Sequence, residues 1–270
     1  MTDRLNETTT GLRFLTPFLL LLLLYCGNAP KLKAATTPAR EDSVVIEKKK
    51  IVIIRTGKLA RDFPERRRAV ISYPVIKGGQ SPMVLRKVRS LLQLKNIFDT
   101  SLAEYKADAW LDELDYQVNY NRNFILDITF TQSGVGAYPD TQTKHFAINL
   151  KTGEVIKASE AFKPTALRTL ADMADRKLQE EVRGIIKDNS QGANVTDEDR
   201  KSLKEQFEQV KFEPANLDEF SVNGQGITFL YDAGFPHVIA ALEPAGQYFF
   251  SYAELRSFIK ADGPLGSFVK

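Results

Sequence analysis

The feature that most constrains the fold is an alternation of apolar and polar residues in two neighbouring segments, Leu114–Asn121 and Asn123–Thr131. Successive side chains of a β-strand point to opposite faces of its sheet, so alternation of this kind predicts strands with one buried face. The residues that share a face within each segment are Tyr116, Val118 and Tyr120, and then Phe124, Leu126, Ile128 and Phe130. Both segments are therefore predicted as half-buried antiparallel strands.

A glycine-containing loop separates this pair from a third expected strand. Gly134–Asp140 reads Gly-Val-Gly-Ala-Tyr-Pro-Asp, and the alternation resumes in His145–Leu150 before a tight turn at Lys151–Gly153. The side chains expected to point inward are Phe146, Ile148 and Leu150. His145 alternates with Phe146 and is predicted to face the surface.

The segments before this region predict strands followed by helices. Val44–Ile54 is expected as a strand pair or one long edge strand, in which three consecutive lysines protect the edge. Val70–Val75 is expected as a short strand that Pro74 ends. Ser81 is predicted to cap a helix that has Pro82 in its first turn and ends near Leu94, and a second helix is expected from Asp99 or Thr100 to Trp110.

The C-terminal part begins with helices and returns to strands. An apolar stripe predicts a long helix over Leu167–Ile186, and acidic residues from Asp197 to Asp199 favour the start of another at Thr196. The strands expected after it are Glu219–Val222, Ile227–Tyr231, Val238–Leu242 and Tyr248–Phe250, and a capping box at Ser251 predicts a last helix on Leu255, Phe258 and Ile259. Segregated blocks of helices and strands predict an α+β fold, with antiparallel sheets, helices packed on one side, and two interlocked halves, residues 45–164 and 165–270.

The N-terminus predicts export. An apolar run of about a dozen residues, Phe14–Tyr25, follows Arg4 and Arg13, and it is shorter than the roughly 20 residues that span a bilayer. We interpret residues 1–34 as a signal peptide, cleaved near Ala34, and 35–44 as a linker. Membrane attachment is expected only through an uncleaved signal or through a lipid on Cys26, the single cysteine, and the large Tyr25 before it disfavours the lipid. The expected location is extracytoplasmic, either periplasmic or secreted.

The charge gives no support to nucleic-acid binding. The formal charge of the chain is +3, and residues 1–34 contribute four basic and two acidic side chains to it. The remainder is close to neutral, so no nucleic-acid partner is expected.

The sequence offers no set of residues for catalysis. The two histidines, His145 and His237, lie too far apart for a recognised metal motif, and no nucleophile elbow, phosphate loop or dinucleotide motif occurs. We therefore predict no catalytic residues, no metal and no cofactor. His237 follows a Gly-Phe-Pro bend, where it can pack or meet Asp232 or Tyr231.

The candidate binding residues fall in three places. The first is the loop with Tyr138, Pro139 and Asp140, where tyrosine is a common contact residue, although a β-bulge or wide hairpin also explains this segment. The second is the bend with Phe235 and His237. The third is the acidic cluster with Asp112 and Asp115, which a solvated face also explains and which suits a cationic protein.

Several short motifs occur in an order that resembles a bacterial extracytoplasmic module. They are Val70–Ile76, Tyr116–Asn121, Gly136–Pro139, Asn149–Gly153, Ala161-Phe162, and then Ile227–Tyr231, Ala240–Gly246 and Phe250–Leu255. The module resembles the one found in peptidoglycan deacetylases and in the lysozyme-sensing ectodomain of an anti-sigma factor. We expect neither a sigma-binding segment before the apolar run nor a deacetylase domain after the module, and we interpret the chain as a standalone exported module.

The resemblance implies an α+β fold and, as in its sensing members, binding of a lysozyme-like protein. We predict an exported, non-catalytic binding module of the cell envelope, with a lysozyme-like protein or the peptidoglycan glycan as partner. An envelope hydrolase or deacetylase and a structural envelope component are the alternatives. A cationic protein requires an acidic surface and salt-dependent attraction, whereas a neutral glycan requires aromatic surfaces such as Tyr138 and Phe235.

Overall fold

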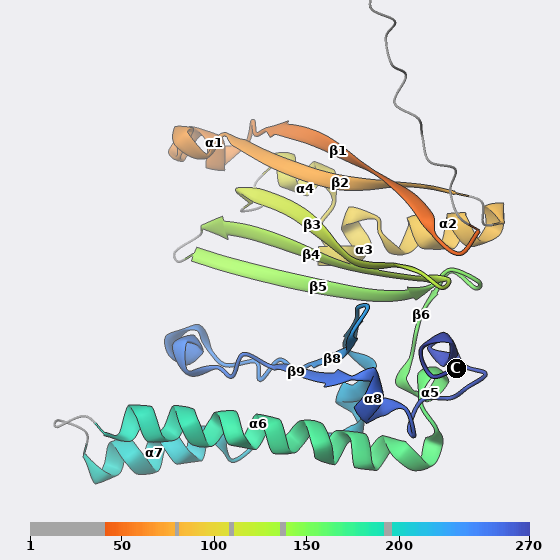
Figure 1. Ribbon diagram of the computed structural model, residues 1–270. Coiled ribbons are helices and arrows are strands. Elements are labelled where there is room, and N and C mark those ends of the chain that lie inside the picture. The colour runs from red at the N-terminus through yellow and green to blue at the C-terminus, as the bar shows by residue number, and fades with distance from the viewer. Residues whose placement is uncertain (1–40, 79–80, 108–110, 136–138, 192–195) are drawn as a thin grey trace, which may run out of the picture. The chain divides into compact units, whose positions relative to one another are not determined.

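The computed structural model describes residues 41–78, 81–107, 111–135, 139–191 and 196–270 (Figure 1). They form an α+β structure with two sheets, which confirms the predicted fold class. The predicted signal peptide, Cys26, Asp108, Trp110 and Tyr138 lie outside the described residues. Among the helices that are described, none has the length and apolar character needed to cross a bilayer.

The larger sheet has six strands in sequence order, and one pairing is parallel. Its strands are β1 (Val44–Ile54), β2 (Arg68–Gly78), β3 (Glu113–Arg122), β4 (Ile125–Val135), β5 (Pro139–Asn149) and β6 (Glu154–Val155). β2 and β3 run parallel through Val70 and Ile71, and all other neighbours in this sheet are antiparallel. The predicted wholly antiparallel sheet is therefore corrected to a mixed one, because the helices between β2 and β3 carry the chain back to the same end of the sheet.

The prediction that Pro74 ends its strand is wrong, since β2 continues to Gly78 with Pro74 opposite Lys48 of β1. Proline interrupts a strand because it has no N–H to donate to a neighbour. Here β3 pairs with β2 only at Val70 and Ile71, so one side of β2 has no partner strand among the described residues at Pro74. The N–H that Pro74 lacks would point to that side, so its absence breaks no hydrogen bond of the sheet.

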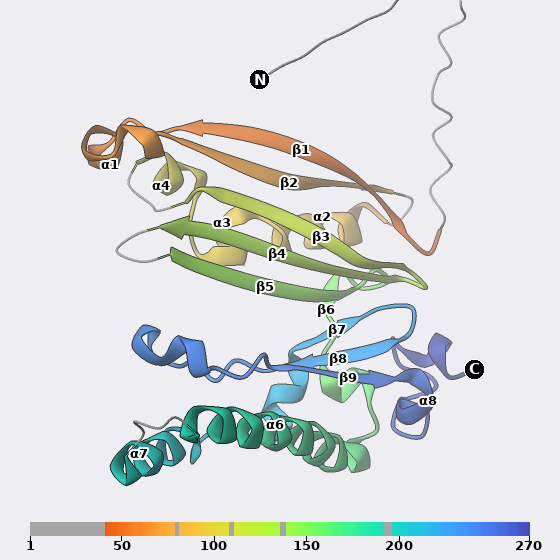
Figure 2. The ribbon, with the colours of Figure 1, turned by 60° about the vertical axis from the view of Figure 1, so that its left-hand side comes forward.

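Short helices cover one face of the larger sheet (Figures 1 and 2). The helical segments of this half are α1 (Lys58–Asp62), η1 (Pro64–Arg66), α2 (Pro82–Leu91), α3 (Leu94–Phe98) and α4 (Leu102–Ala107). The Ser81 side chain accepts a hydrogen bond from the Val84 N–H, as predicted for the cap of α2. The helix expected to end near Leu94 ends at Leu91. The next predicted helix begins at Leu102 instead of Asp99 or Thr100, because Asp99 adopts a left-handed conformation, with φ of 51°, at the end of α3.

The smaller sheet is a three-stranded antiparallel sheet in sequence order. Its strands are β7 (Phe220–Val222), β8 (Gly226–Leu230) and β9 (Gln247–Ser251). The helical segments of this part are α5 (Ala158–Ala161), η2 (Pro164–Ala166), α6 (Leu167–Ser190), α7 (Asp197–Phe207), η3 (Pro214–Asp218), η4 (His237–Leu242), α8 (Tyr252–Leu255) and η5 (Gly266–Phe268).

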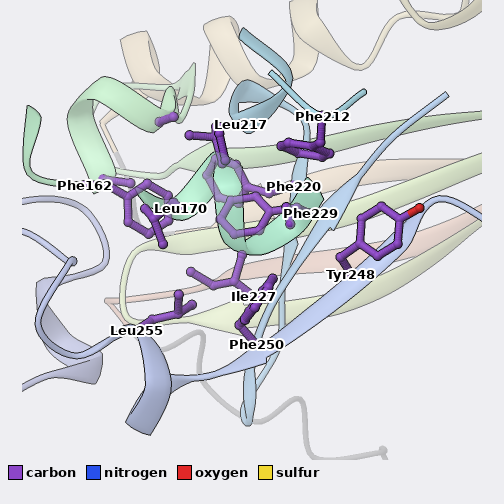
Figure 3. Close-up of a cluster of buried hydrophobic side chains, with 14 of the residues drawn as sticks. Phe162, Leu170, Phe212, Leu217, Phe220, Ile227, Phe229, Tyr248, Phe250 and Leu255 are labelled. Atoms are coloured by element: carbon purple, nitrogen blue, oxygen red, sulfur yellow. The ribbon is translucent and has the colours of Figure 1, made fainter. Parts of the chain in front are cut away.

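The predicted long helix is confirmed and extends to Ser190 as α6. Its apolar stripe, which includes Leu170 and Leu178, packs into an aromatic core against the smaller sheet. The Phe229 ring lies at the centre of that core, with centroids 5.8 to 6.4 Å from the rings of Phe162, Phe212, Phe220 and Phe250 (Figure 3).

Two predictions near the C-terminus are wrong. Val238–Leu242 lies in the 3-10 helix η4 and not in a strand, because β8 is the central strand and β7 and β9 already occupy both of its sides. The last helix has the predicted capping box at Ser251 but ends at Leu255. Beyond one further turn the chain straightens, because Ile259 forms a β-bridge with Phe162.

Strand β4 from Ile125 to Phe130 and strand β5 from Phe146 to Ile148 contribute to cores on both faces, which corrects the prediction of half-buried strands for these parts. Leu126 and Ile128 belong to the core beneath α2 to α4, whereas Ile125 belongs to the aromatic core of the smaller sheet. On β5, Ile148 lies in the first core and Ala147 in the second. The smaller sheet covers the face that the alternation assigned to solvent, so these two strands join the two cores.

Candidate functional site

Strand β5 has an unpaired edge along half of its length. β6 pairs with it only at Ile148 and Asn149. On that side, the Ala147 carbonyl accepts from the Ile156 N–H at 2.8 Å. Every second residue of an antiparallel strand turns both backbone polar groups to the same neighbour, so Thr141, Thr143 and His145 turn theirs to this side as well. No strand among the described residues pairs with β5 there.

This edge faces an open groove of about 1360 Å³. Residues Thr141 to His145 line one wall, together with Lys95 to Asp99 from α3 and the turn after it. The opposite wall is formed by Leu230 to Asp232, at the end of β8, and by Glu243 to Gln247, which lead into β9. The volume exceeds the roughly 300–1,000 Å³ typical of small-ligand pockets. The groove therefore has room for a polymer segment.

The groove continues along β5 into a second cavity of about 250 Å³. Lys144, His145 and Glu219 line both cavities. The second cavity reaches Ala147 and Ile156, where β6 begins to pair. The unpaired edge thus borders two cavities that share three lining residues.

Charge in the groove is predominantly acidic. Its described lining residues include four carboxylates, Asp99, Glu219, Asp232 and Glu243, against the two lysines Lys95 and Lys144. Three of these carboxylates, Glu219, Asp232 and Glu243, lie on the side of the groove opposite β5. A positively charged ligand is favoured by this balance.

Gly246 fixes the shape of the opposite wall. Its φ is +64°, which favours glycine, and an added Cβ would lie 1.9 Å from the Tyr231 carbonyl oxygen. The close approach lets the Gly246 carbonyl accept from the Tyr231 N–H at 2.9 Å. This pairing extends the β8–β9 ladder beyond Leu230 and Gln247 and carries the wall along the groove.

A buried polar cluster lies at the inner end of the groove. Asp127 of β4 is fully buried and accepts from the Val222 N–H of β7 at 2.6 Å and from Asn119 Nδ2 of β3 at 2.7 Å. His145 Nε2 lies 3.0 Å from Asp127 Oδ1, and His145 Nδ1 lies 2.7 Å from the Thr129 hydroxyl. Because a carboxylate only accepts, His145 donates from Nε2. The cluster ties the two sheets together.

The predicted surface position of His145 is therefore wrong, since only 7% of its side chain is exposed. The reason is the same as for β4: β7 packs against the face that the alternation assigned to solvent. His145 still borders the groove, while both of its ring nitrogens are engaged by Asp127 and Thr129.

The Thr129–His145–Asp127 arrangement has the order of a nucleophile, base and acid, but its surroundings favour a structural role. The Thr129 hydroxyl is half-buried in a central strand, accepts from Asn119 Nδ2 at 2.8 Å, and is not part of the groove lining. A nucleophile must reach the reacting atom of a bound substrate. Among the described residues, no group of three or more His, Cys, Asp or Glu side chains is arranged to hold a metal ion.

The predicted Gly134–Asp140 loop is corrected to a tighter hairpin. β4 continues to Val135 and β5 begins at Pro139, so that Gly134 pairs with Asp140 and Val135 with Pro139. Asp140 is exposed, and its carboxylate accepts from Gln142 Nε2 at 3.0 Å. Tyr138 lies outside the described residues, and of Pro139 only the backbone position is described.

The remaining predicted site residues lie in different surroundings. The Phe235 ring packs 5.3 Å from Phe207, and its N–H donates to Glu243 of the groove wall at 3.3 Å. The backbone of His237 begins η4, and its side chain is not among the described ones. These two residues therefore belong to the segment that continues the groove wall.

Both residues of the predicted acidic cluster, Asp112 and Asp115, lie close to a basic side chain. Asp115 forms an ion pair with Lys48 at 2.6 Å. Burial acts to raise the pKa of Asp115, but the hydrogen bonds from the Lys48 side chain and the Tyr116 N–H, together with the Lys48 charge, lower it below its usual range. Asp112 lies 3.8 Å from Arg66. A nearby basic group reduces the attraction that each carboxylate exerts on a cationic partner.

The fold and the site define an α+β protein in which an unpaired strand edge borders an acidic groove. No protein-family model matches the chain, and no curated protein matches it. Among solved structures, a DUF3298 family protein from Pseudomonas aeruginosa is similar with 11% identity and a TM-score of 0.49, covering 81% of this chain and 94% of its own. A DUF3298 family member from Bacteroides fragilis has 15% identity and a TM-score of 0.48, covering 85% and 99%. Neither is described as a deacetylase or an anti-sigma factor.

Proposed function

We propose that this chain is an exported, non-catalytic binding module of the bacterial cell envelope, and that the groove beside β5 is its binding site. The observation that carries the proposal is the unpaired strand edge facing an open groove. Edge strands usually carry features that prevent pairing with other chains, and the exposed charge of Lys144 is such a feature on β5. The groove wall opposite β5 is not needed to prevent such pairing. It encloses space in which a ligand can bind.

Two partners from the sequence analysis remain in the proposal, a lysozyme-like cationic protein and the peptidoglycan glycan. The excess of carboxylates in the groove favours the cationic protein. The glycan has less support, because the Tyr231 ring of the β8 wall packs 5.8 Å from Phe212 and its hydroxyl accepts from the Lys211 N–H. The alternative function, an envelope hydrolase or deacetylase, is supported only by the buried Thr129–His145–Asp127 arrangement.

The test measures binding with the groove open and filled. The immobilised full chain is incubated with lysozyme and with purified peptidoglycan, and the Gln247→Trp variant places a large side chain in the groove. We expect at least about tenfold weaker binding, equal to about 1.4 kcal/mol. Lys49→Trp, on the exposed part of β1, is the matched control and is expected to bind normally. Equal binding by all three proteins, or binding of neither probe, would overturn the proposed site.

Salt separates the two partners. Attraction to a cationic protein weakens as the screening length falls from about 10 Å at 0.1 M salt to about 3 Å at 1 M, whereas glycan binding changes little. Release of soluble fragments from peptidoglycan, lost in a Thr129→Val variant, would support the hydrolase alternative instead. Export is tested separately by N-terminal sequencing of the envelope fraction, where a chain that begins after about Ala34 is expected.

A further inference from the structure

We propose that the groove binds an extended polypeptide segment, which adds a strand to the free edge of β5 and directs a lysine or arginine side chain toward the acidic wall. This inference rests on the proposed function and names the class of ligand at the same site. It is carried by two independent features, the backbone groups of β5 and the charges opposite them.

The backbone groups supply the first feature. Thr141, Thr143 and His145 each present an N–H and a carbonyl to the groove, at the spacing of alternate strand residues. An added strand lies about 4.8 Å from its neighbour and rises about 3.3 Å per residue, so the edge from Thr141 to His145 pairs with about five residues of ligand. Recognition of this kind depends on main-chain hydrogen bonds, and side-chain pockets give the specificity. A glycan has no regular series of donors and acceptors to match this edge.

The acidic wall supplies the second feature. A strand paired with β5 places alternate side chains toward the two faces of the extended sheet. One of these faces is directed to the smaller sheet, where Glu219, Asp232 and Glu243 line the groove. The Asp232 carboxylate accepts from the Gly234 N–H, and Glu243 accepts from the Phe235 N–H, so both are held in place by the backbone. A lysine or arginine at the matching ligand position meets these positioned carboxylates.

The test begins with a pool of randomised, proline-free decapeptides, selected on the immobilised full chain. The selected peptides are expected to be enriched in lysine and arginine. In the free protein, the amide protons of Thr141, Thr143 and His145 are expected to exchange quickly, and those of Gln142 and Lys144, which pair with β4, slowly. A bound peptide is expected to slow exchange at the first three by at least about tenfold and to leave the other two unchanged.

Substitutions at one position separate backbone from side-chain recognition. Thr143→Pro removes the N–H on the groove side, which an edge strand tolerates, and is expected to abolish peptide binding. Thr143→Ala retains that N–H and is expected to bind more tightly than Thr143→Pro, which separates loss of the N–H from loss of the side chain. A peptide that is N-methylated at alternate residues provides a second test without altering the protein, and it is expected not to bind.

The inference is overturned if no peptide is selected, if the three amides stay unprotected, or if Thr143→Pro and the N-methylated peptide bind normally. In those cases the proposed function still holds if Gln247→Trp weakens binding of lysozyme or peptidoglycan. If Gln247→Trp weakens none of these interactions, the proposed site itself fails. Selection of peptides that correspond to β5 itself would indicate pairing between two copies of this chain and would also overturn the inference.

Discussion

At the scale of single residues, the polar cluster at the inner end of the groove is what sequence patterns could not predict. Asp127 occupies an outward position in an alternating strand, so the pattern places it in solvent, as it does His145. Both side chains are buried because β7, nearly a hundred residues away along the chain, packs over them, with Val222 N–H bonded to Asp127. The alternation of residues within one strand carries no information about packing by a segment so far away along the chain. The only signal in the sequence is an aspartate among large apolar residues.

Replacing Asp127 with asparagine is expected to destabilise the fold. Both carboxylate oxygens accept hydrogen bonds, so in either orientation the asparagine NH₂ meets a donor such as Val222 N–H or Asn119 Nδ2. Each buried donor left without an acceptor costs about 1–3 kcal/mol. Chemical denaturation measures the loss in the free energy of unfolding. Asp140→Asn is the control at an exposed carboxylate of the neighbouring strand and is expected to stay within about 0.5 kcal/mol. An equally small effect at Asp127 would contradict the structural role of the cluster.

At the scale of elements, local signals predicted what local interactions determine. The caps at Ser81 and Ser251 and the apolar stripe of α6 are confirmed, because each depends on residues a few positions apart. The parallel pairing of β2 with β3 and the helical η4 segment were missed, because each depends on which strands occupy neighbouring positions in a sheet. The groove was not predicted, since none of the predicted site residues is among its lining residues, although Asp140 and Phe235 lie beside residues that are.

The contact between α6 and β9 gives a prediction about alkaline pH. The Tyr248 hydroxyl donates to Glu181 Oε2 at 3.0 Å, and burial, followed by this bond and the Glu181 charge, raises the pKa of Tyr248 far above 10. A tyrosine with a raised pKa stabilises the fold below its unfolded value of about 10, and this contribution is lost as the pH rises above that value. The free energy of unfolding is therefore expected to fall above about pH 10.

The Tyr248→Phe variant isolates this contribution. It is expected to lose about 1 kcal/mol at pH 7, because the hydrogen bond to Glu181 is absent. Above about pH 10 its stability is expected to fall less steeply than that of the natural chain, since one titrating group is removed. Burial also raises the pKa of Tyr252, so part of the slope remains in the variant. Identical slopes in urea denaturation from pH 9 to pH 11 would contradict this account of the contact.

At the scale of the whole molecule, β4 and β5 explain why fold and groove occur together. Both strands contribute side chains to the core beneath α2 to α4 and to the aromatic core of the smaller sheet. The Asp127 cluster bonds the smaller sheet to their inner ends, and the groove lies further along β5, beside Thr141 to His145. The strand edge that borders the groove therefore continues directly from the part of β5 that both cores hold.

The central claim is that a polypeptide binds beside β5, and site-specific photo-cross-linking in the cell envelope tests it most directly. A photoreactive phenylalanine derivative is placed at Thr143, which lines the groove, or at Lys49, which is also exposed, on β1. The account predicts a cross-linked polypeptide from position 143 that is absent from position 49 and is lost when Gln247→Trp fills the groove. Cross-links of equal yield from both positions, or cross-links at position 143 that Gln247→Trp does not reduce, would contradict it.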